Sequence, residues 1–325
     1  MRVAQPVATV AVPVLNEERS IVECLRRLRE QTVEDIEILI ADGGSSDRTR
    51  ELVTEAARND CRIRLIDNPE RLQSAGLNAC LDEATSPLIV RMDGHAFVEP
   101  DYVERCLAVS RSTGAAVVGG VMVPVPRPGL VPEAIALANR SWWGAGPARF
   151  HGGGQEGPAE TVYLGAVRTS VARRLGGWAE DVGVNEDYEF NHRVRAAGEV
   201  VWFDPSLRVQ YEPRSSLHAV VRQYFRYGRS KARVMLRHPS SIRGRQLVPL
   251  GIAPVVASMG LRRTRHPVAF GGVAVYLLSL TAGASRAQAP LTVRIVALGV
   301  ALTMHLAWSA GAWSALVVPI RSASA

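Results

Sequence analysis

Several familiar site signatures are missing from this chain of 325 residues. It has no G-x-x-x-x-G-K-[ST] loop and no G-x-G-x-x-G after its first apolar run, which excludes the usual nucleoside-triphosphate and dinucleotide sites. It has no serine nucleophile elbow, no Cys/His zinc spacing and no internal repeat. These absences leave acidic and polar side chains near strand ends as the candidates for chemistry.

Cysteine and lysine are scarce. The four cysteines are Cys24, Cys61, Cys80 and Cys106. They form no C-x-x-C pair, and three fall in apolar helical patterns, which favours buried free thiols in a reducing compartment. Lys231 is the only lysine, so arginine supplies nearly all of the positive charge behind the net charge of +7. Arginine bias can reflect coding composition alone; as chemistry, it indicates an anionic partner.

Short apolar runs of strand type alternate with helical patterns in the first part of the chain. The runs lie at residues 7–14, 36–41, 63–66, 88–92 and 115–123. The first helix carries an apolar stripe, and Ser20 and Glu23 before and within it match a capping box. Alternation of this kind predicts an α/β fold with a mostly parallel sheet and helices on both faces. The N-terminal run has no cleavage-site pattern, so we expect no signal peptide and a cytoplasmic N-terminal part.

The amino-acid composition changes after the fifth apolar run. Residues 124–160 are rich in Pro, Gly and Trp, which predicts a mobile loop region beside a site. Regular structure resumes at Thr161, with helices expected at 169–175 and 187–197. We expect the catalytic domain to comprise residues 1–213.

Residues 214–245 are strongly basic, with apolar residues interleaved among the arginines. This pattern predicts a basic amphipathic helix that lies on an anionic membrane surface. Nucleic acid would need the same residues, but apolar segments follow directly, so the membrane interpretation is preferred and no nucleic-acid partner is expected.

Three apolar stretches form a membrane-associated region, residues 246–325. Residues 246–261 are short and hold two prolines, whereas 267–284 and 295–320 are long enough to span a bilayer. The basic loop 262–266 is expected on the cytoplasmic side. This favours an interfacial or re-entrant segment at 246–261, followed by a transmembrane hairpin; three full spans are the alternative.

Two carboxylates follow strand-type runs. Asp93, with His95 two residues later, follows the run 88–92, and Asp42 follows the run 36–41. Ligands of open α/β sheets bind beyond the carboxyl ends of strands, where Asp93 and His95 suit a divalent metal that also takes diphosphate oxygens. Asp42 suits a hydrogen bond to a nucleoside base. The alternatives are an ordinary turn at Asp93 and an Asx-type turn at Asp42.

Two further groups are candidates for the site. Glu186 and Asp187 begin a predicted helix, where acidic residues are favoured by the helix dipole; the functional alternative is a general base for an acceptor hydroxyl. Gln223 and Arg226 share a helix face from which both reach a diphosphate or a sugar chain.

Five short motifs in this order resemble the family 2 glycosyltransferases with a GT-A fold, a Rossmann-like architecture. They are Val12-Pro13-Val14-Leu15-Asn16-Glu17, Asp42-Gly43-Gly44-Ser45-Ser46-Asp47, Arg91-Met92-Asp93-Gly94-His95, Asn185-Glu186-Asp187 and Gln223-x-x-Arg226-Tyr227. The chain is most similar to membrane-attached bacterial members that build exopolysaccharide, of the succinoglycan-glucosyltransferase type. The resemblance covers about residues 7–240.

The resemblance implies a nucleotide-sugar donor, usually UDP-linked, a Mg²⁺ or Mn²⁺ ion, and inversion at the anomeric carbon. By position, Pro13, Asn16, Glu17 and Asp42 would hold the nucleoside. Asp93 and His95 would bind metal and diphosphate, Asp187 in the Glu186-Asp187 pair would be the base, and Gln223 and Arg226 would match the Q-x-x-R-W element.

Two departures from the family pattern bear on function. The D-x-D element is D-x-H here, which changes the expected metal affinity, and Q-x-x-R-W is Q-x-x-R-Y. Few apolar segments follow, so we expect transfer of a single sugar to a lipid-linked or membrane-borne glycan at the inner membrane, with a cytoplasmic catalytic domain. A sugar nucleotidyltransferase and an inactive membrane-surface scaffold are the alternatives.

Overall fold

The computed structural model describes residues 5–260 and 267–317 and divides the chain into two compact units. Unit 1 comprises Met1–Val123 and Gly153–Tyr211, and unit 2 comprises Pro124–Gly152 and Glu212–Ala325. Unit 1 ends close to the expected boundary at residue 213. The segment 124–152 belongs to unit 2 instead.

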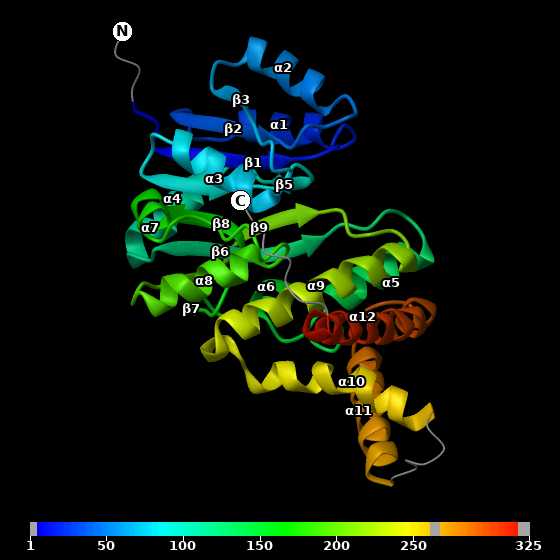
Figure 1. Cartoon of the computed structure of the whole chain (residues 1–325). Helices are drawn as coiled ribbons and strands as arrows, with labels where there is room; N and C mark the ends of the chain where they lie inside the picture. The colour runs from blue at the N-terminus through cyan, green and yellow to red at the C-terminus, as the bar shows by residue number, and fades with distance from the viewer. Residues whose placement is uncertain (1–4, 261–266, 318–325) are drawn as a thin grey trace. The chain divides into compact units, whose positions relative to one another are not determined.

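Unit 1 is built on one mixed sheet (Figure 1). Its strands are β1 (Ala8–Val14), β2 (Ile36–Asp42), β3 (Ile63–Asp67), β4 (Leu88–Arg91), β5 (Ala96–Val98), β6 (Val117–Pro124), β7 (Gly157–Pro158), β8 (Tyr163–Arg168) and β9 (Val201–Tyr211). The order is β3-β2-β1-β4-β8-β6-β9-β5, with β7 paired to β9. The ladders joining β3, β2, β1 and β4 are parallel, whereas β8 is antiparallel to both β4 and β6.

Helices cover both faces of this sheet, as the sequence predicts. They are α1 (Ile21–Arg29), α2 (Thr49–Asn59), α3 (Gln73–Glu83), α4 (Tyr102–Thr113), α7 (Thr169–Arg174) and α8 (Glu186–Ala196). Helices α1, α2 and α4 share one buried core with alternate residues of β1, β2 and β4. On the other face α3 lies close to β1 and β2; the Cys80 thiol is 3.5 Å from the Leu39 carbonyl oxygen.

The start of α1 differs from the expected capping box. Ser20 is the N-cap residue, but its hydroxyl donates to Glu17 Oε2 at 2.8 Å and makes no cap bond within the helix. Glu23 instead accepts bonds from Arg26 and Arg27. The predicted capping box is wrong because the Glu17 carboxylate takes the hydrogen bond of the Ser20 hydroxyl.

Unit 2 contains only helices among its described residues. They are α5 (Leu130–Asn139), α6 (Arg149–Gly152), α9 (Leu217–Arg237), the 3₁₀ helix η1 (Pro239–Ser241), α10 (Gly244–Gly260), α11 (Pro267–Ser285) and α12 (Leu291–Val317). The segment 124–160, predicted as a loop region, thus holds α5, whose apolar side packs in a core with α12.

Two glycines let α9 and α12 lie side by side (Figure 1). A Cβ added at Gly228 would lie 1.9 Å from the Trp308 carbonyl oxygen, and one added at Gly311 would lie 2.0 Å from that of Phe225. Ala232 clusters one turn further along with alanines of α12. Small residues therefore bring the two backbones into direct contact over several turns.

One helix of the described chain, Leu291–Leu316, is long and apolar enough to cross a membrane. The apolar stretches in α10 and α11, Gln246–Ser258 and Phe270–Ser285, are shorter. The predicted segments 246–261, 267–284 and 295–320 coincide with α10, α11 and α12, and the basic loop 262–266 and residues 318–320 lie outside the described residues. The α/β fold with apolar C-terminal helices is confirmed.

Candidate active site

The loops that follow β1 and β2 are joined by hydrogen bonds. The Asn16 side-chain oxygen accepts a 2.8 Å bond from the Ser46 amide, and the Asn16 amide donates to the Ser45 hydroxyl at 2.9 Å. Asn16 has a φ of 57°, a left-handed conformation that asparagine tolerates better than most residues. The Glu17 amide donates to the Thr49 hydroxyl at 2.7 Å. These bonds hold Asn16 and Glu17 at the carboxyl ends of the parallel strands.

Pro13 and Asp42 are both buried. A Cβ added at Gly76 of α3 would lie 2.9 Å from Pro13 Cβ, so Pro13 packs against that helix. The Asp42 side chain is fully buried; it accepts a 2.6 Å bond from the Ser45 hydroxyl and lies 3.2 Å from Arg50 Nη1. Asp42 therefore forms the turn given as the alternative to a ligand contact. The nucleoside contacts of Pro13 and Asp42 stay predictions.

Asp93 and His95 lie in the short turn between β4 and β5. Asp93 Oδ1 accepts a 2.7 Å bond from Gln73 Nε2 at the start of α3, and it lies 3.7 Å from Arg91 Nη2. His95 Nδ1 lies 2.9 Å from Glu17 Oε1. The structure thus brings His95 to the β1 loop and Asp93 to α3, at the edge of the sheet where the sequence predicts a site.

The donor set fits a divalent metal shared with a phosphate-bearing ligand. Within residues 5–260 and 267–317, no group of three or more His, Cys, Asp or Glu side chains could hold a metal ion. Mg²⁺, however, is usually held by one or two carboxylates together with substrate phosphates and water. A histidine ligand normally hydrogen-bonds a carboxylate through its other ring nitrogen, and Glu17 is that carboxylate for His95.

A buried ion pair connects β4 to α8. Arg91 Nη2 lies 2.7 Å from Glu186 Oε1, and the two side chains are 9% and 4% exposed. Burial lowers the pKa of Arg91, but the carboxylates of Glu186, Asp93 and Asp187 outweigh burial and leave that pKa above its ordinary value. Burial raises the pKa of Glu186 and Arg91 opposes this, while Asp187 adds to the rise.

Asp187 is the more accessible member of the acidic pair. Glu186 is 3% exposed, whereas Asp187 is partly exposed in the first turn of α8. Its Oδ1 accepts a 2.7 Å bond from the Tyr188 amide. Asn185 just before α8 has a φ of 72°, so the helix begins at a sharp left-handed turn. A partly exposed carboxylate can reach an acceptor hydroxyl, and a buried, paired one cannot, which favours Asp187 as the base.

Gln223 and Arg226 lie on α9 and so belong to unit 2. The Gln223 amide donates to the Tyr227 hydroxyl at 3.0 Å, and Arg226 is exposed. The tyrosine that replaces the family's tryptophan thus bonds the glutamine of its own motif. The predicted diphosphate contacts of Gln223 and Arg226 stay predictions.

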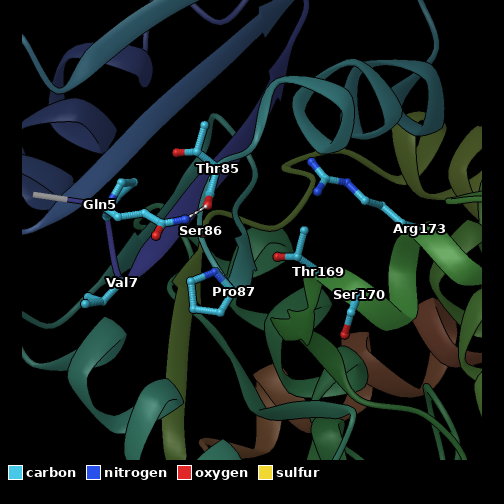
Figure 2. A pocket seen from close by; sticks show the side chains of 9 residues that line it. Gln5, Val7, Thr85, Ser86, Pro87, Thr169, Ser170 and Arg173 are labelled. Atoms are coloured by element: carbon cyan, nitrogen blue, oxygen red, sulfur yellow. Dashed lines mark hydrogen bonds between the residues drawn. The ribbon is translucent and has the colours of Figure 1, made fainter.

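A cavity of about 450 Å³ lies at the opposite end of the parallel strands (Figure 2). Its lining includes the chain before β1, the loop before β4 and the start of α7, with Gln5 bonded to the Thr85 carbonyl oxygen. None of the predicted site residues lines it. The cavity is therefore distinct from the site at the carboxyl ends.

Three residues near the site at the carboxyl ends of the strands are not predicted from the sequence. Gln73 bonds Asp93, and Arg91 pairs with Glu186. Arg71 has a φ of 57° and lies against the loop after β2, with its Cα 3.4 Å from a Cβ added at Gly43. Arg91 had a signal: it is a charged residue within the otherwise apolar run Leu88-Ile89-Val90-Arg91-Met92. Nothing in the sequence singles out the other two.

Comparisons with known proteins bear on the family and the fold of the chain. The chain is 33% identical over 319 residues to the "Succinoglycan biosynthesis protein ExoA" of Rhizobium meliloti (strain 1021), covering 95% of this chain and 94% of that protein. Among solved structures it resembles mannosyltransferase PcManGT from Pyrobaculum calidifontis in complex with GDP-Man and Mn²⁺. That likeness has a TM-score of 0.61 and 21% identity, and covers 96% of this chain and 87% of the other. A residue 1–349 fragment of S. aureus TarS in complex with UDP gives a TM-score of 0.50 at 13% identity, with coverage of 94% and 90%.

The likenesses to solved structures show the fold, and the sequence comparisons show the family. The sequence pattern of the family described as "Glycosyl transferase family 2" matches residues 9–174, which include the β1 and β2 loops and the D-x-H turn. The resemblance predicted from the five motifs is confirmed: the chain belongs to glycosyl transferase family 2.

Proposed function

We propose that this glycosyltransferase moves a single sugar, with inversion, from a nucleotide-sugar to a lipid-linked or membrane-borne glycan in exopolysaccharide biosynthesis. The donor is proposed to be UDP-linked and the reaction to need Mn²⁺ or Mg²⁺. The full-length relationship to the succinoglycan protein supports the pathway class. The neighbours that hold GDP-Man with Mn²⁺, or UDP, support a nucleotide-sugar donor and a metal.

The observation that carries the proposal is the meeting of two motifs at one guanidinium. Arg91 Nη2 lies 2.7 Å from Glu186 and 3.7 Å from Asp93. The D-x-H turn and the start of α8 are therefore neighbours at one edge of the sheet, although 95 residues separate Arg91 from Glu186 in sequence. Direct displacement needs a group that holds the leaving diphosphate and a base close to the same sugar carbon.

Each residue then has a role set by its place. Asp93 and His95 would hold the metal, which when bound neutralises charge on the leaving diphosphate. Glu17 orients the His95 ring through the 2.9 Å contact. Asp187 accepts the proton of the acceptor hydroxyl as that oxygen attacks the sugar carbon, and the nucleoside diphosphate leaves from the opposite side.

Unit 2 is proposed to bind the cytoplasmic face of the inner membrane. Counted over the sequence, it carries 18 Arg and Lys against two acidic residues, a net charge of +16. Unit 1 carries 20 basic against 29 acidic residues, a net charge of −9, and the two together give the +7 of the chain. Positive charge is thus concentrated in the unit that holds the apolar helices, which supports an anionic membrane as the partner.

The surface of α9 supports the same partner. Arg222, Arg226, Arg229 and Arg233 recur every three or four residues and so share one face of the helix, beside the face that packs on α12. Large apolar side chains are exposed on α11 and α12, among them Val275, Leu278 and Ile295. We propose that α11 and the exposed side of α12 contact the membrane, with the arginines of α9 reaching the lipid headgroups.

Release of nucleoside diphosphate from a panel of UDP-, GDP- and dTDP-sugars tests the reaction. Detergent-solubilised protein is assayed with a lipid extract as the acceptor source, in Mn²⁺, in Mg²⁺ or in EDTA. We expect release from one donor in the presence of metal only, and a product glycoside of inverted anomeric configuration by NMR.

Other outcomes select the alternatives. Pyrophosphate release from a nucleoside triphosphate and a sugar 1-phosphate would identify a nucleotidyltransferase. Donor binding by calorimetry without turnover in any condition would identify a scaffold. Flotation with vesicles of phosphatidylglycerol, but not of phosphatidylcholine, tests the membrane partner independently.

A further inference from the structure

The Arg91–Glu186 pair is an unusual way to stabilise a fold. Both side chains are more than nine-tenths buried, and two further donors of Arg91, Nε and Nη1, are buried without a hydrogen-bond partner among the described residues. An unmade buried hydrogen bond costs about 1–3 kcal/mol. Buried ion pairs are in general weak stabilisers that well-packed apolar residues can replace. Stability alone therefore does not account for Arg91.

The position of Arg91 points to a different role. Arg91 is the last residue of β4, paired with Ala11 of β1 and Gly165 of β8, so its backbone is fixed in the middle of the sheet. Its guanidinium leaves the sheet towards α8 and meets Glu186, the first residue of that helix. One rigid strand is thereby tied to the start of the helix that carries Asp187.

The backbone at the start of α8 has a conformation that its surroundings must hold. Asn185 at its N-cap holds a left-handed φ of 72°, and its side chain makes no cap bond to the helix. Asparagine tolerates this conformation better than most residues, but such a turn persists only where the surroundings fix it. The 2.7 Å contact between Glu186 and Arg91 is a fixed point one residue away.

Resting on the proposed transfer reaction, we propose that Arg91 is a positioning residue that sets the distance between the donor-binding Asp93 and the base Asp187. In this role Arg91 contacts neither the transferred sugar nor the acceptor hydroxyl. It acts through Glu186 on the helix start and through the 3.7 Å approach to Asp93 on the turn after β4. A displacement of about 1 Å between reacting groups can lower a rate roughly 100-fold, so a loose α8 would slow transfer without weakening donor binding.

The test compares Arg91→Met, Glu186→Gln and the double variant. Each single variant leaves one buried polar partner uncompensated and is expected to melt at a lower temperature, with kcat at least 30-fold lower. The double variant removes both charges; it is expected to regain most of the melting temperature while kcat stays low and the donor KM stays within threefold of the parent. Recovery of kcat along with stability would overturn the proposal, because the pair would then be structural only.

Two further variants keep the test decisive. Arg91→Lys retains a charge that reaches Glu186 but lacks the planar, multiply donating guanidinium; we expect an unchanged melting temperature and a kcat at least tenfold lower, and full activity would overturn the proposal. Glu189→Gln removes the charge from another ion pair of α8, the 2.8 Å contact of buried Glu189 with partly exposed Arg193, and is expected to lower stability while keeping kcat. If the parent releases no nucleoside diphosphate from any donor, the proposed function itself has failed.

Discussion

Replacing Glu17 by Gln tests how the D-x-H turn binds metal. In the parent the Glu17 carboxylate lies 2.9 Å from His95 Nδ1 and accepts a 2.8 Å bond from the Ser20 hydroxyl. A glutamine can keep the Ser20 bond and nearly the same volume, but it removes the negative charge that orients the His95 ring. Loss of such a partner lowers metal affinity about 10- to 100-fold.

The structure favours the lower end of that range. The side chains of His95 and Glu17 are 42% and 24% exposed, so water screens their interaction. We therefore expect the half-activating Mn²⁺ concentration of Glu17→Gln to rise about tenfold, which is about 1.4 kcal/mol, with kcat at saturating metal close to that of the parent.

The assay is nucleoside diphosphate release against Mn²⁺ concentration, with donor saturating. Glu18→Gln is the matched control, because Glu18 is the adjacent carboxylate and accepts from the Arg48 amide rather than facing His95. Superimposable activation curves for Glu17→Gln and the parent would refute the metal role of His95.

Three other outcomes are expected. Asp187→Asn should lower kcat at least 1,000-fold and leave donor affinity within threefold, by activity and calorimetry; unchanged turnover would exclude it as the base. Gly120→Ala should destabilise unit 1 by about 3 kcal/mol or more and lower its melting temperature roughly 6–12 °C, because the added Cβ would lie 1.9 Å from the Leu207 carbonyl oxygen. Native protein should bind one equivalent of a thiol reagent at pH 8, at exposed Cys61, and four after unfolding. The remaining thiols are those of Cys24, Cys80 and Cys106. Burial raises the pKa of each to about 12, which suppresses formation of the reactive thiolate. More than one fast-reacting thiol would contradict this burial.

Much of unit 1 could be predicted because its signals are local. Apolar runs mark β1, β2 and β4, and the first polar residues after them mark the edge that holds Asn16 and Asp93. Strand direction is not encoded locally. The apolar run 115–123 would look the same in a parallel or an antiparallel ladder, and only pairing with β8 makes β6 antiparallel.

Long-range pairing explains what the sequence did not reveal. Glu186 reads as an ordinary helix-start carboxylate, and its partner Arg91 lies 95 residues earlier. The sequence likewise gives no sign of the 3.2 Å contact between Asp42 and Arg50, and the nucleoside contact of Asp42 stays a prediction. Ser20 matched a capping motif and found Glu17 instead. In each case a spatial neighbour decides the bond, and spacing along the chain does not encode that neighbour.

The place of α5 has a practical consequence for making a soluble fragment. α5 lies between β6 and β7 in sequence, yet its buried Ala134, Ile135 and Ala138 pack in one core with residues of α12. A fragment ended at Tyr211 would keep α5 and discard α9 and α12, exposing an apolar helix to water. Such a fragment is expected to precipitate or to need detergent, whereas replacing 124–152 with a short polar linker should give a fragment that crystallises without detergent.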